Sequence, residues 1–311
     1  MKIHRDGDWL HSRIDKRWQG KPLASCLAEG FRLQESRFRQ LFQEQKVWIG
    51  DSAIAWQDRD MVLQPGMRIR LPIVPENGYG IEPDYHPDVE LVFEDEHCLV
   101  VNKPADMLVH PDRPGRRGTL DAVVAFHYLQ QGVMIKPRHV HRLDKDTSGL
   151  VLYAKHAESH RLLDQQLANK HILRRYWAII QGRLPKTKGT ISLPIGRDRY
   201  YRQKRVISKS GLPAITRYQV IKTQDAPGIG SCKIIELQLE TGRTHQIRVH
   251  LSHLGAPIAG DSLYGGAAVP LLPAGRQALH AYALQFDHPY TREPIFCEIE
   301  WPEDIKQAFQ L

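Results

Sequence analysis

The sequence predicts an α+β protein, with a mixed, mainly antiparallel sheet in a large domain and a small α+β domain before it. After residue 88, runs with the composition of strands do not alternate one for one with helical patterns, which argues against a doubly wound parallel sheet. A segment rich in Pro, Gly and Asn at residues 75–87 separates two apolar regions. With 311 residues and 41% apolar content, the chain is long enough for two cores. We therefore expect domains at residues 1–75 and 89–311, joined by a linker at 76–88.

The first domain is predicted to contain a basic helix and a small sheet. Apolar residues at positions 33, 38, 41 and 42 are close to helical spacing over residues 33–45, and they leave Arg37 and Arg39 free to face outward. Residues 46–51 are typical of a short strand and turn, and a Pro-Gly pair precedes an alternating strand at 67–72. An ordinary small domain with a solvated basic helix remains an alternative to an RNA-binding one.

The second domain is predicted to consist mainly of strands. Its first two strands, separated by an acidic segment at residues 94–97, indicate a hairpin. Strands are expected at residues 89–93, 98–102, 149–154, 176–182, 214–222, 232–240 and 295–301. Helices are expected at residues 120–131, 158–169 and 244–254.

The charge is basic and unevenly distributed. The chain has 43 Lys and Arg against 35 Asp and Glu, a net charge of +8. Lys and Arg outnumber Asp and Glu by 13 to 9 in residues 1–75 and by 25 to 15 in residues 138–311, whereas residues 76–137 have 5 against 11. This balance favours a polyanionic partner, and nucleic acid is the first candidate.

The remaining composition points to a cytoplasmic protein. The four cysteines are far apart and include no C-x-x-C pair, so neither a disulfide framework nor a structural zinc site is expected. Asp6 and Asp8 lie where a signal peptide needs an apolar run, and no stretch approaches the roughly 18 apolar residues of a membrane span.

The polar segment at residues 141–149 is the first candidate for chemistry, because it runs directly into an apolar strand. Asp144, flanked by Arg142 and Lys145, should stay ionised and is a candidate nucleophile. The same composition also fits a turn in which the side chains of residues 146–148 satisfy backbone donors.

A second candidate segment, residues 241–250, combines a glycine, two arginines and two histidines at the start of the predicted helix. Arg243, near the N-terminus of that helix, would suit an anion. An ordinary surface helix is the alternative. A zinc site of His245, His250 and His253 is not supported, because only the last pair has helical spacing and no Cys or carboxylate completes the set.

A third candidate segment, residues 197–205, interleaves basic residues, among them Arg202 and Arg205, with two tyrosines. Cationic side chains bind phosphates and aromatic faces stack on bases, so this segment could be a nucleic-acid arm, with a solvated basic loop as the alternative. The sequence contains no phosphate loop, no dinucleotide-binding glycine turn and no G-x-S-x-G motif, so nucleotide-driven and cofactor-driven classes are disfavoured.

Five ordered segments of residues 89–301 resemble motifs of the RluA-type family of RNA pseudouridine synthases. Residues 141–150 match the H-R-L-D-x-x-T-S-G-L pattern of that family without departure. Asp106 stands where the family usually has glycine, and Arg174 replaces a usual lysine. The matching segments are residues 102–111, 141–150, 174–178, 242–251 and 257–265. Residues 7–73 resemble the alpha-L RNA-binding motif, a module that is common in this family.

The resemblance implies a fold of the pseudouridine synthase type and isomerisation of uridine to pseudouridine in RNA, without metal or cofactor. The N1–C1′ bond is cleaved, the uracil rotates, and the base is rejoined through C5. We expect RNA as the partner, with ribosomal RNA favoured over transfer RNA, no membrane association, and a monomer. A flipped-out target favours a structured loop.

The resemblance also implies roles for particular residues. Asp144 resembles the catalytic aspartate, which attacks C1′ or the uracil ring. Arg243 resembles the arginine that pairs with that carboxylate, and Tyr176 the tyrosine that stacks on uracil and removes the C5 proton. Arg142 resembles the side chain that fills the space of the flipped nucleotide. Further RNA contacts are expected from His141, Arg174, Arg248, Arg37, Arg39, Arg202 and Arg205.

Two other functions remain open at this point. The departures at Asp106 and Arg174 are compatible with a catalytically silent RNA-binding protein of the same fold. A metal-dependent nuclease or phosphotransferase would use Asp144 and Asp146.

Overall fold

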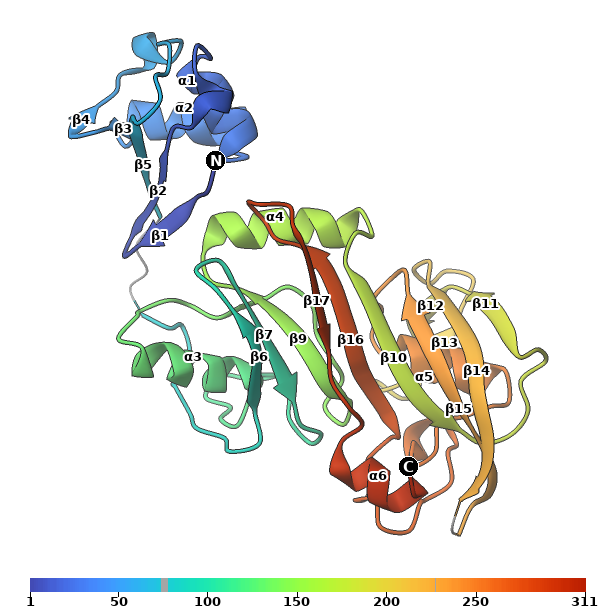
Figure 1. The fold of residues 1–311 in the computed structure, drawn as a ribbon. Helices are drawn as coiled ribbons and strands as arrows, with labels where there is room; N and C mark the ends of the chain where they lie inside the picture. Colours follow the sequence, from blue (N-terminus) through green and yellow to red (C-terminus); the bar gives the residue numbers. More distant parts are fainter. Residues whose placement is uncertain (74–77, 227) are drawn as a thin grey trace.

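The computed structural model describes residues 1–73, 78–226 and 228–311, and it contains two separate sheets (Figure 1). The expected domain end at residue 75 and the first residues of the expected linker lie outside the described residues. Residues 78–88 of that linker form neither helix nor strand. We refer below to residues 1–73 as the N-terminal domain and to residues 89–311 as the large domain.

The N-terminal domain packs a five-stranded sheet against short helices. Its strand order is β1-β2-β5-β3-β4. The predicted basic helix is confirmed as α2, which begins two residues later than expected and buries Phe38, Leu41 and Phe42. The elements are β1 (His4–Asp6), β2 (Trp9–Arg13), α1 (Leu23–Ser25), a π-helical turn (Cys26–Gly30), α2 (Glu35–Gln43), β3 (Trp48–Ile49), β4 (Ser52–Ala53) and β5 (Arg68–Pro72).

The large domain contains a ten-stranded sheet with the order β11-β14-β15-β10-β16-β9-β7-β6, to which β17 and β8 add by pairing with β16 and β9. Among the described strand pairs only β9 and β16 run parallel, which confirms the mixed, mainly antiparallel prediction. Its strands are β6 (Glu90–Glu94), β7 (Cys98–Lys103), β8 (Arg138–His139), β9 (Ser148–Ala154), β10 (Leu173–Ile180), β11 (Lys188–Ser192), β14 (Ile215–Ala226), β15 (Gly230–Leu239), β16 (Leu279–Asp287) and β17 (Pro294–Glu298). A separate hairpin pairs β12 (Ile195–Arg197) with β13 (Arg205–Ile207).

The centre of the sheet in the large domain is buried on both faces. Successive residues of a strand point to opposite sides, and in β7 and β9 nearly all of them are buried. In β7, Leu99 and Val101 join the core that contains α3 (Leu120–Gln130), α5 (Gln246–His253) and α6 (Glu303–Phe309). Cys98 and Val100 join a second core that contains α4 (Ala157–Ala168). The predicted hairpin of β6 and β7 is confirmed.

Several predicted boundaries differ from the structure, and several elements were not predicted, among them β16 and α6. Helix α5 begins at Gln246 because His245 adopts a left-handed backbone with φ of 59°. Strand β10 begins earlier than expected, and β17 ends at Glu298. Strand β16, at the centre of the sheet, was missed because it is buried on both faces and shows no alternation. Helix α6 was also missed.

The N-terminal domain is docked on the large domain beside α4 (Figure 1). Leu162 of α4 and Tyr290 of the β16–β17 turn are part of the N-terminal core. Arg37 pairs with Glu158 at 3.0 Å. These contacts fix the N-terminal domain relative to the sheet.

The described helices are all too short or too polar to cross a bilayer.

Candidate active site

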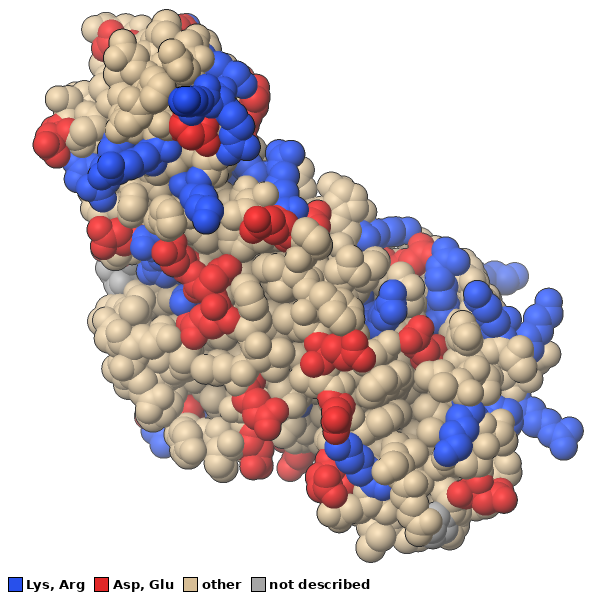
Figure 2. Space-filling view, viewed as in Figure 1, with Lys and Arg blue, Asp and Glu red and all other residues tan. Residues whose placement is uncertain are grey.

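A cleft of about 1220 Å³ opens beside the loop between β8 and β9. It exceeds the roughly 300–1,000 Å³ of small-molecule pockets, so it suits a polymer. The described residues that line it include eight Lys and Arg against five Asp and Glu. Figure 2 shows that Lys and Arg also gather on the N-terminal domain and on the end of the large domain that carries β11 and β14.

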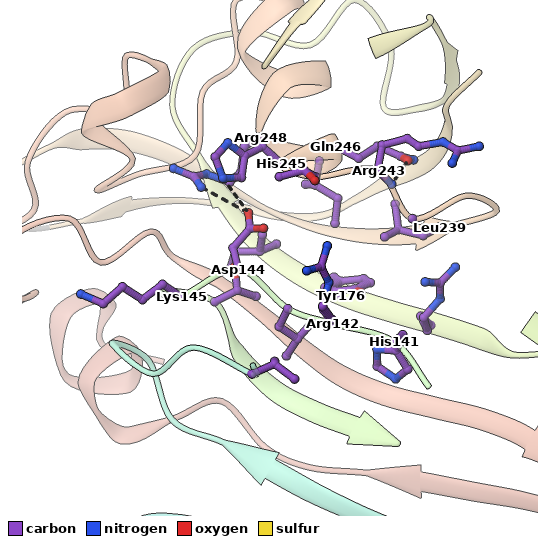
Figure 3. Close-up of a pocket in the computed structure, with 18 of the residues that line it drawn as sticks. His141, Arg142, Asp144, Lys145, Tyr176, Leu239, Arg243, His245, Gln246 and Arg248 are labelled. Atoms are coloured by element: carbon purple, nitrogen blue, oxygen red, sulfur yellow. Dashed lines mark hydrogen bonds and ion pairs between the residues drawn. The ribbon is translucent and has the colours of Figure 1, made fainter. Parts of the chain in front are cut away.

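Asp144 lies in this cleft and points toward Arg248 and His245 (Figure 3). Its Oδ2 accepts a hydrogen bond from Nη1 of Arg248 at 3.2 Å, and Nε2 of His245 lies 4.0 Å away. Asp144 is half-buried and remains open to the cleft. The carboxylate is therefore oriented by the protein and accessible to a ligand.

Arg248 is the central cation of the site, and it is only 8% exposed. Its Nε and Nη2 donate to the two carboxylate oxygens of Asp261 at 2.8 Å each, a bidentate pair. The guanidinium also lies 5.0 Å from the ring centroid of Tyr264. Burial opposes its charge, but hydrogen bonds and the charges of Asp261 and Asp144 raise the pKa of Arg248 above its usual value. Asp261 therefore orients Arg248, which in turn orients Asp144.

The expected pairing of Arg243 with Asp144 is wrong, because Arg248 makes that contact. Arg243 is exposed, donates from Nε to the carbonyl oxygen of Pro213 at 3.1 Å, and points away from Asp144 (Figure 3). The left-handed turn at His245 places Arg243 outside the helix and Arg248 on its inner face. The guanidinium of Arg248, which we expected to contact RNA, is engaged by the two carboxylates.

Tyr176 lies on β10 at the edge of the cleft and is 4% exposed. The pairing of β10 with β16 shifts register between Arg175 and Trp177, a bulge that changes the direction of the side chain between them. Burial and, to a smaller extent, the charge of Asp144 raise the pKa of Tyr176, although Arg174 opposes them. The hydroxyl is therefore protonated near neutral pH.

His141 is buried, and an RNA contact by its ring is not supported. Its Nε2 accepts a hydrogen bond from the backbone N of Leu152 at 3.3 Å. Burial, the nearby charge of Arg174 and His139 lower its pKa to about 3, so the ring is neutral. His141 anchors the start of the loop on β9.

Arg174 is a buried cation beside the same cleft. It is 7% exposed, and its Nε has no hydrogen-bond partner among the described residues. It lines the cleft with Tyr176. A buried Nε–H without a partner is suited to bind an anion.

The loop that carries Asp144 is held from beneath by Lys103 of β7. Its Nζ is buried and donates to the backbone carbonyls of Pro104, Met107 and Lys145 at 2.7, 2.8 and 2.9 Å. Burial, with the nearby charge of Arg276, lowers its pKa to about 7.

Two further contacts hold the end of the loop. Arg276 donates from Nη1 to the carbonyl of Asp146 at 2.9 Å and from Nη2 to Oγ of Ser148 at 2.8 Å. A Cβ on Gly149 would lie 2.3 Å from the carbonyl oxygen of Ala281, and Gly149 has φ of 121°. Only glycine fits here, because β16 approaches the backbone so closely.

The glycine usual at position 106 also has a structural reason. Asp106 adopts φ of 61°, a conformation that glycine enters freely and that Asp tolerates better than most residues. Its carboxylate pairs with Lys145. The departure at Asp106 is therefore compatible with an intact loop.

The other predicted RNA contacts divide into exposed and buried groups. Arg142 and Arg202 are exposed, and with the half-buried Arg205 they line the cleft. Arg39 is exposed on α2. Arg37 is not free to face outward as expected, because it pairs with Glu158 at the domain interface.

Sequence reasoning missed Asp261 and Tyr264. Both lie in a segment that was recognised only as a motif. Asp261 could have been noticed because it is a carboxylate in a largely apolar segment. Such a residue is expected to be buried only when a cation pairs with it, and Asp261 is buried. His245 was considered only as a zinc ligand, whereas its Nδ1 bonds the Tyr264 hydroxyl at 2.8 Å.

Comparison with known proteins identifies the family of this chain. The family described as RNA pseudouridylate synthase matches residues 97–253. An uncharacterized RNA pseudouridine synthase of Bacillus subtilis, YhcT, is 39% identical over 98% of this chain and 97% of its own length. The ribosomal large subunit pseudouridine synthase D of Zymomonas mobilis is 40% identical over 72% of each chain. The solved structure of human RNA pseudouridylate synthase domain containing 1 is 25% identical, covers 74% of this chain and 91% of that chain, and has a TM-score of 0.58.

The family match spans the strand that supports the loop, the loop itself and helix α5, which supplies Arg248. The similarity to YhcT extends over nearly the whole chain. The chain therefore belongs to the RNA pseudouridine synthases of the RluA type, isomerases that convert uridine in RNA to pseudouridine.

Proposed function

We propose that this enzyme modifies a uridine of large-subunit ribosomal RNA, with Asp144 as the nucleophile and without a cofactor. The observation that carries the proposal is the ordered contact from Asp261 through Arg248 to Asp144 in a cleft large enough for RNA. The choice of RNA follows from relatives such as the Zymomonas mobilis protein, whose name states that substrate.

The chemistry needs only groups that this chain supplies. The N1–C1′ bond breaks, the C5–C1′ bond forms, C5 loses a proton and N1 gains one, so no oxidant or reductant is consumed. Arg248 pairs with Asp144 and orients its carboxylate in the cleft, where that carboxylate attacks C1′ or the uracil ring. Tyr176 stacks on the uracil, gives its hydroxyl proton to N1 of the detached base and takes the C5 proton in return, so it is protonated again at the end of the reaction.

The RNA is held by cations around the cleft. Arg174 binds a phosphate near the target nucleotide, because its guanidinium is buried with an unsatisfied Nε. Arg142, exposed beside Asp144, fills the space of the flipped nucleotide. Arg202, Arg205 and the residues between β12 and β13 contact the flanking strand.

The N-terminal domain extends the same RNA surface. It resembles the alpha-L motif over residues 7–73, and Arg39 is exposed on its basic helix. Because the N-terminal domain is docked on α4, its basic helix α2 has a constant orientation relative to the large domain. We also propose that the enzyme acts as a monomer in the cytoplasm.

Tritium release tests the proposal, since pseudouridine has the same mass as uridine. Transcripts of large-subunit ribosomal RNA and of transfer RNA are labelled at uridine C5 and incubated with the wild-type protein or with Asp144→Ala. We expect release from ribosomal RNA by the wild type alone. Release by Asp144→Ala would contradict the nucleophile, and release from transfer RNA only would contradict the substrate.

A further inference from the structure

Three residues that are distant in sequence meet at the rim of the cleft. His110 follows β7, Asp121 lies in the first turn of α3, and His139 ends β8. Nδ1 of His110 lies 2.8 Å from Oδ2 of Asp121, and Nδ1 of His139 lies 3.2 Å from Oδ1 of the same carboxylate. The three donor atoms lie within 4.8 Å of one another.

These separations fit a metal ion. Bonds of about 2.0–2.2 Å in tetrahedral geometry place zinc ligands about 3.3 Å apart. Two imidazoles and one carboxylate form a ligand set that zinc accepts while leaving a fourth position open. The three side chains therefore need only small movements to surround one ion.

The carboxylate is held as a metal ligand usually is. Asp121 is 4% exposed, and the hydroxyl of Tyr153 donates to its Oδ1 at 2.8 Å. Such outer contacts fix the orientation of ligating groups. The N-cap of α3 is supplied by Thr119, so capping does not explain Asp121.

The site is open on one side only. Both histidines line the cleft that contains Asp144, whereas Asp121 lies buried behind them. The side chain of His110 is 57% exposed. The open coordination position therefore faces the cleft.

A second cluster of possible metal ligands, Asp95, Cys98 and His288, does not open to the cleft. Oδ1 of Asp95 already accepts from the backbone N atoms of His97 and Cys98. Nδ1 of His288 accepts from backbone N atoms of the turn that follows it. Cys98 and His288 are also buried, and none of the three residues lines the cleft, so a metal here would have no coordination position facing RNA.

We propose that His110, Asp121 and His139 bind one Zn²⁺ ion at the rim of the cleft. Water completes its coordination in the free enzyme. When RNA is bound, a phosphate oxygen replaces that water, a step that rests on the proposed function. The ion adds a fixed positive charge beside the substrate and takes no part in the isomerisation.

Binding of the metal alone tests the site. Metal-free protein is titrated with Co²⁺, whose visible absorption reports tetrahedral coordination, and with Zn²⁺ in competition with a chromophoric chelator. The wild type should bind one equivalent and show the tetrahedral spectrum. His110→Ala, a change at an exposed side chain, should weaken binding by about a hundredfold or more, and Asp121→Asn should do the same.

The matched control is His171→Ala, which removes another exposed histidine, one that does not line the cleft. It should bind like the wild type. No spectral change at equimolar Co²⁺, or equal affinity in wild type and His110→Ala, would overturn the proposal. Because no RNA is present, the result is independent of tritium release, so the site and the proposed function can fail separately.

Discussion

The loop that carries Asp144 and the segment between β12 and β13, which we call the arm (residues 198–204), both border the cleft but are held very differently. Buried groups hold the loop from beneath, among them Lys103 and Arg276. The arm is held by local bonds such as those from the backbone N atoms of Tyr200 and Tyr201 to Asp198. Its tyrosines are 89% and 68% exposed.

This difference separates the residues that carry out the reaction from the residues that only bind RNA. A reacting carboxylate must be held within a fraction of an ångström, and only buried, satisfied contacts provide that precision. An exposed aromatic and basic segment contributes affinity through stacking and phosphate contacts that tolerate movement. We therefore expect changes at the loop and its supports to reduce turnover or stability, and changes at exposed cations and aromatics to reduce RNA affinity.

The largest expected effect is at Arg248. Arg248→Met leaves the carboxylates of Asp144 and Asp261 without their cation, and turnover should fall on the order of a thousandfold. Arg243→Ala should leave turnover within about threefold of wild type, because Arg243 does not contact Asp144. Single-turnover tritium release measures both, and thermal melting checks that each variant is folded. The reverse ranking would restore the motif-based assignment.

The next effect concerns the close approach of β16 to the loop. In Gly149→Ala, the new Cβ would meet the carbonyl of Ala281, and the free energy of unfolding should fall by about 2–4 kcal/mol. Gly132→Ala is the matched control, since Gly132 also has positive φ but has no atom within 4 Å of its Cβ position. It should cost only about 1 kcal/mol. Equal losses in urea unfolding would show that the contact with β16 is unimportant.

Lys103 should make stability depend on pH. Its pKa is about 7 in the folded protein and 10.5 when unperturbed, so between these values the unfolded chain binds a proton that the folded chain does not. Stability of the wild type should therefore rise with pH across this window relative to Lys103→Met, by an amount on the order of a few kcal/mol. Unfolding free energies of both proteins at pH 7 to 10 measure the difference. A constant difference would mean that the lysine stays charged.

The smallest effects distinguish two arginines of α2. Arg39→Ala removes an exposed cation, and the slope of log affinity against log salt should decrease by about 1. Arg37→Ala breaks the pair with Glu158, so it should leave the slope unchanged and lower stability by about 1 kcal/mol. Filter binding at several salt concentrations compares the two. A changed slope in Arg37→Ala would place it on the RNA surface after all.

Strong periodic patterns predicted most elements of the fold. Helices α2, α3 and α4 and the β6–β7 hairpin were found within two residues of their bounds, because an apolar face, a long apolar run or a turn marks each of them. Strand β16 could not be found in this way, since burial on both faces removes the alternation.

The sequence predicted the site residues that lie within contiguous motifs. It did not predict which residues contact one another, because tertiary packing determines those contacts. Asp144 and Tyr176, both named from contiguous motifs, lie in the same cleft. Arg243 and Arg248 belong to one motif, and it is Arg248, on the helix that begins after the left-handed residue His245, that reaches Asp144. The proposed zinc ligands come from separate segments, so their spacing in the sequence carried no signal.

The most direct test of the contrast between loop and arm compares Asp144→Asn with Tyr200→Ala in one experiment on the same labelled ribosomal RNA. Tritium release at saturating enzyme gives the rate of the chemical step, and filter binding gives the Kd. Asp144→Asn should lose at least about a thousandfold in rate and keep its Kd within about threefold. Tyr200→Ala should keep its rate and bind about tenfold more weakly. If Asp144→Asn retains the rate, or if Tyr200→Ala loses rate and keeps its Kd, the division between a buried reacting loop and an exposed binding arm is wrong.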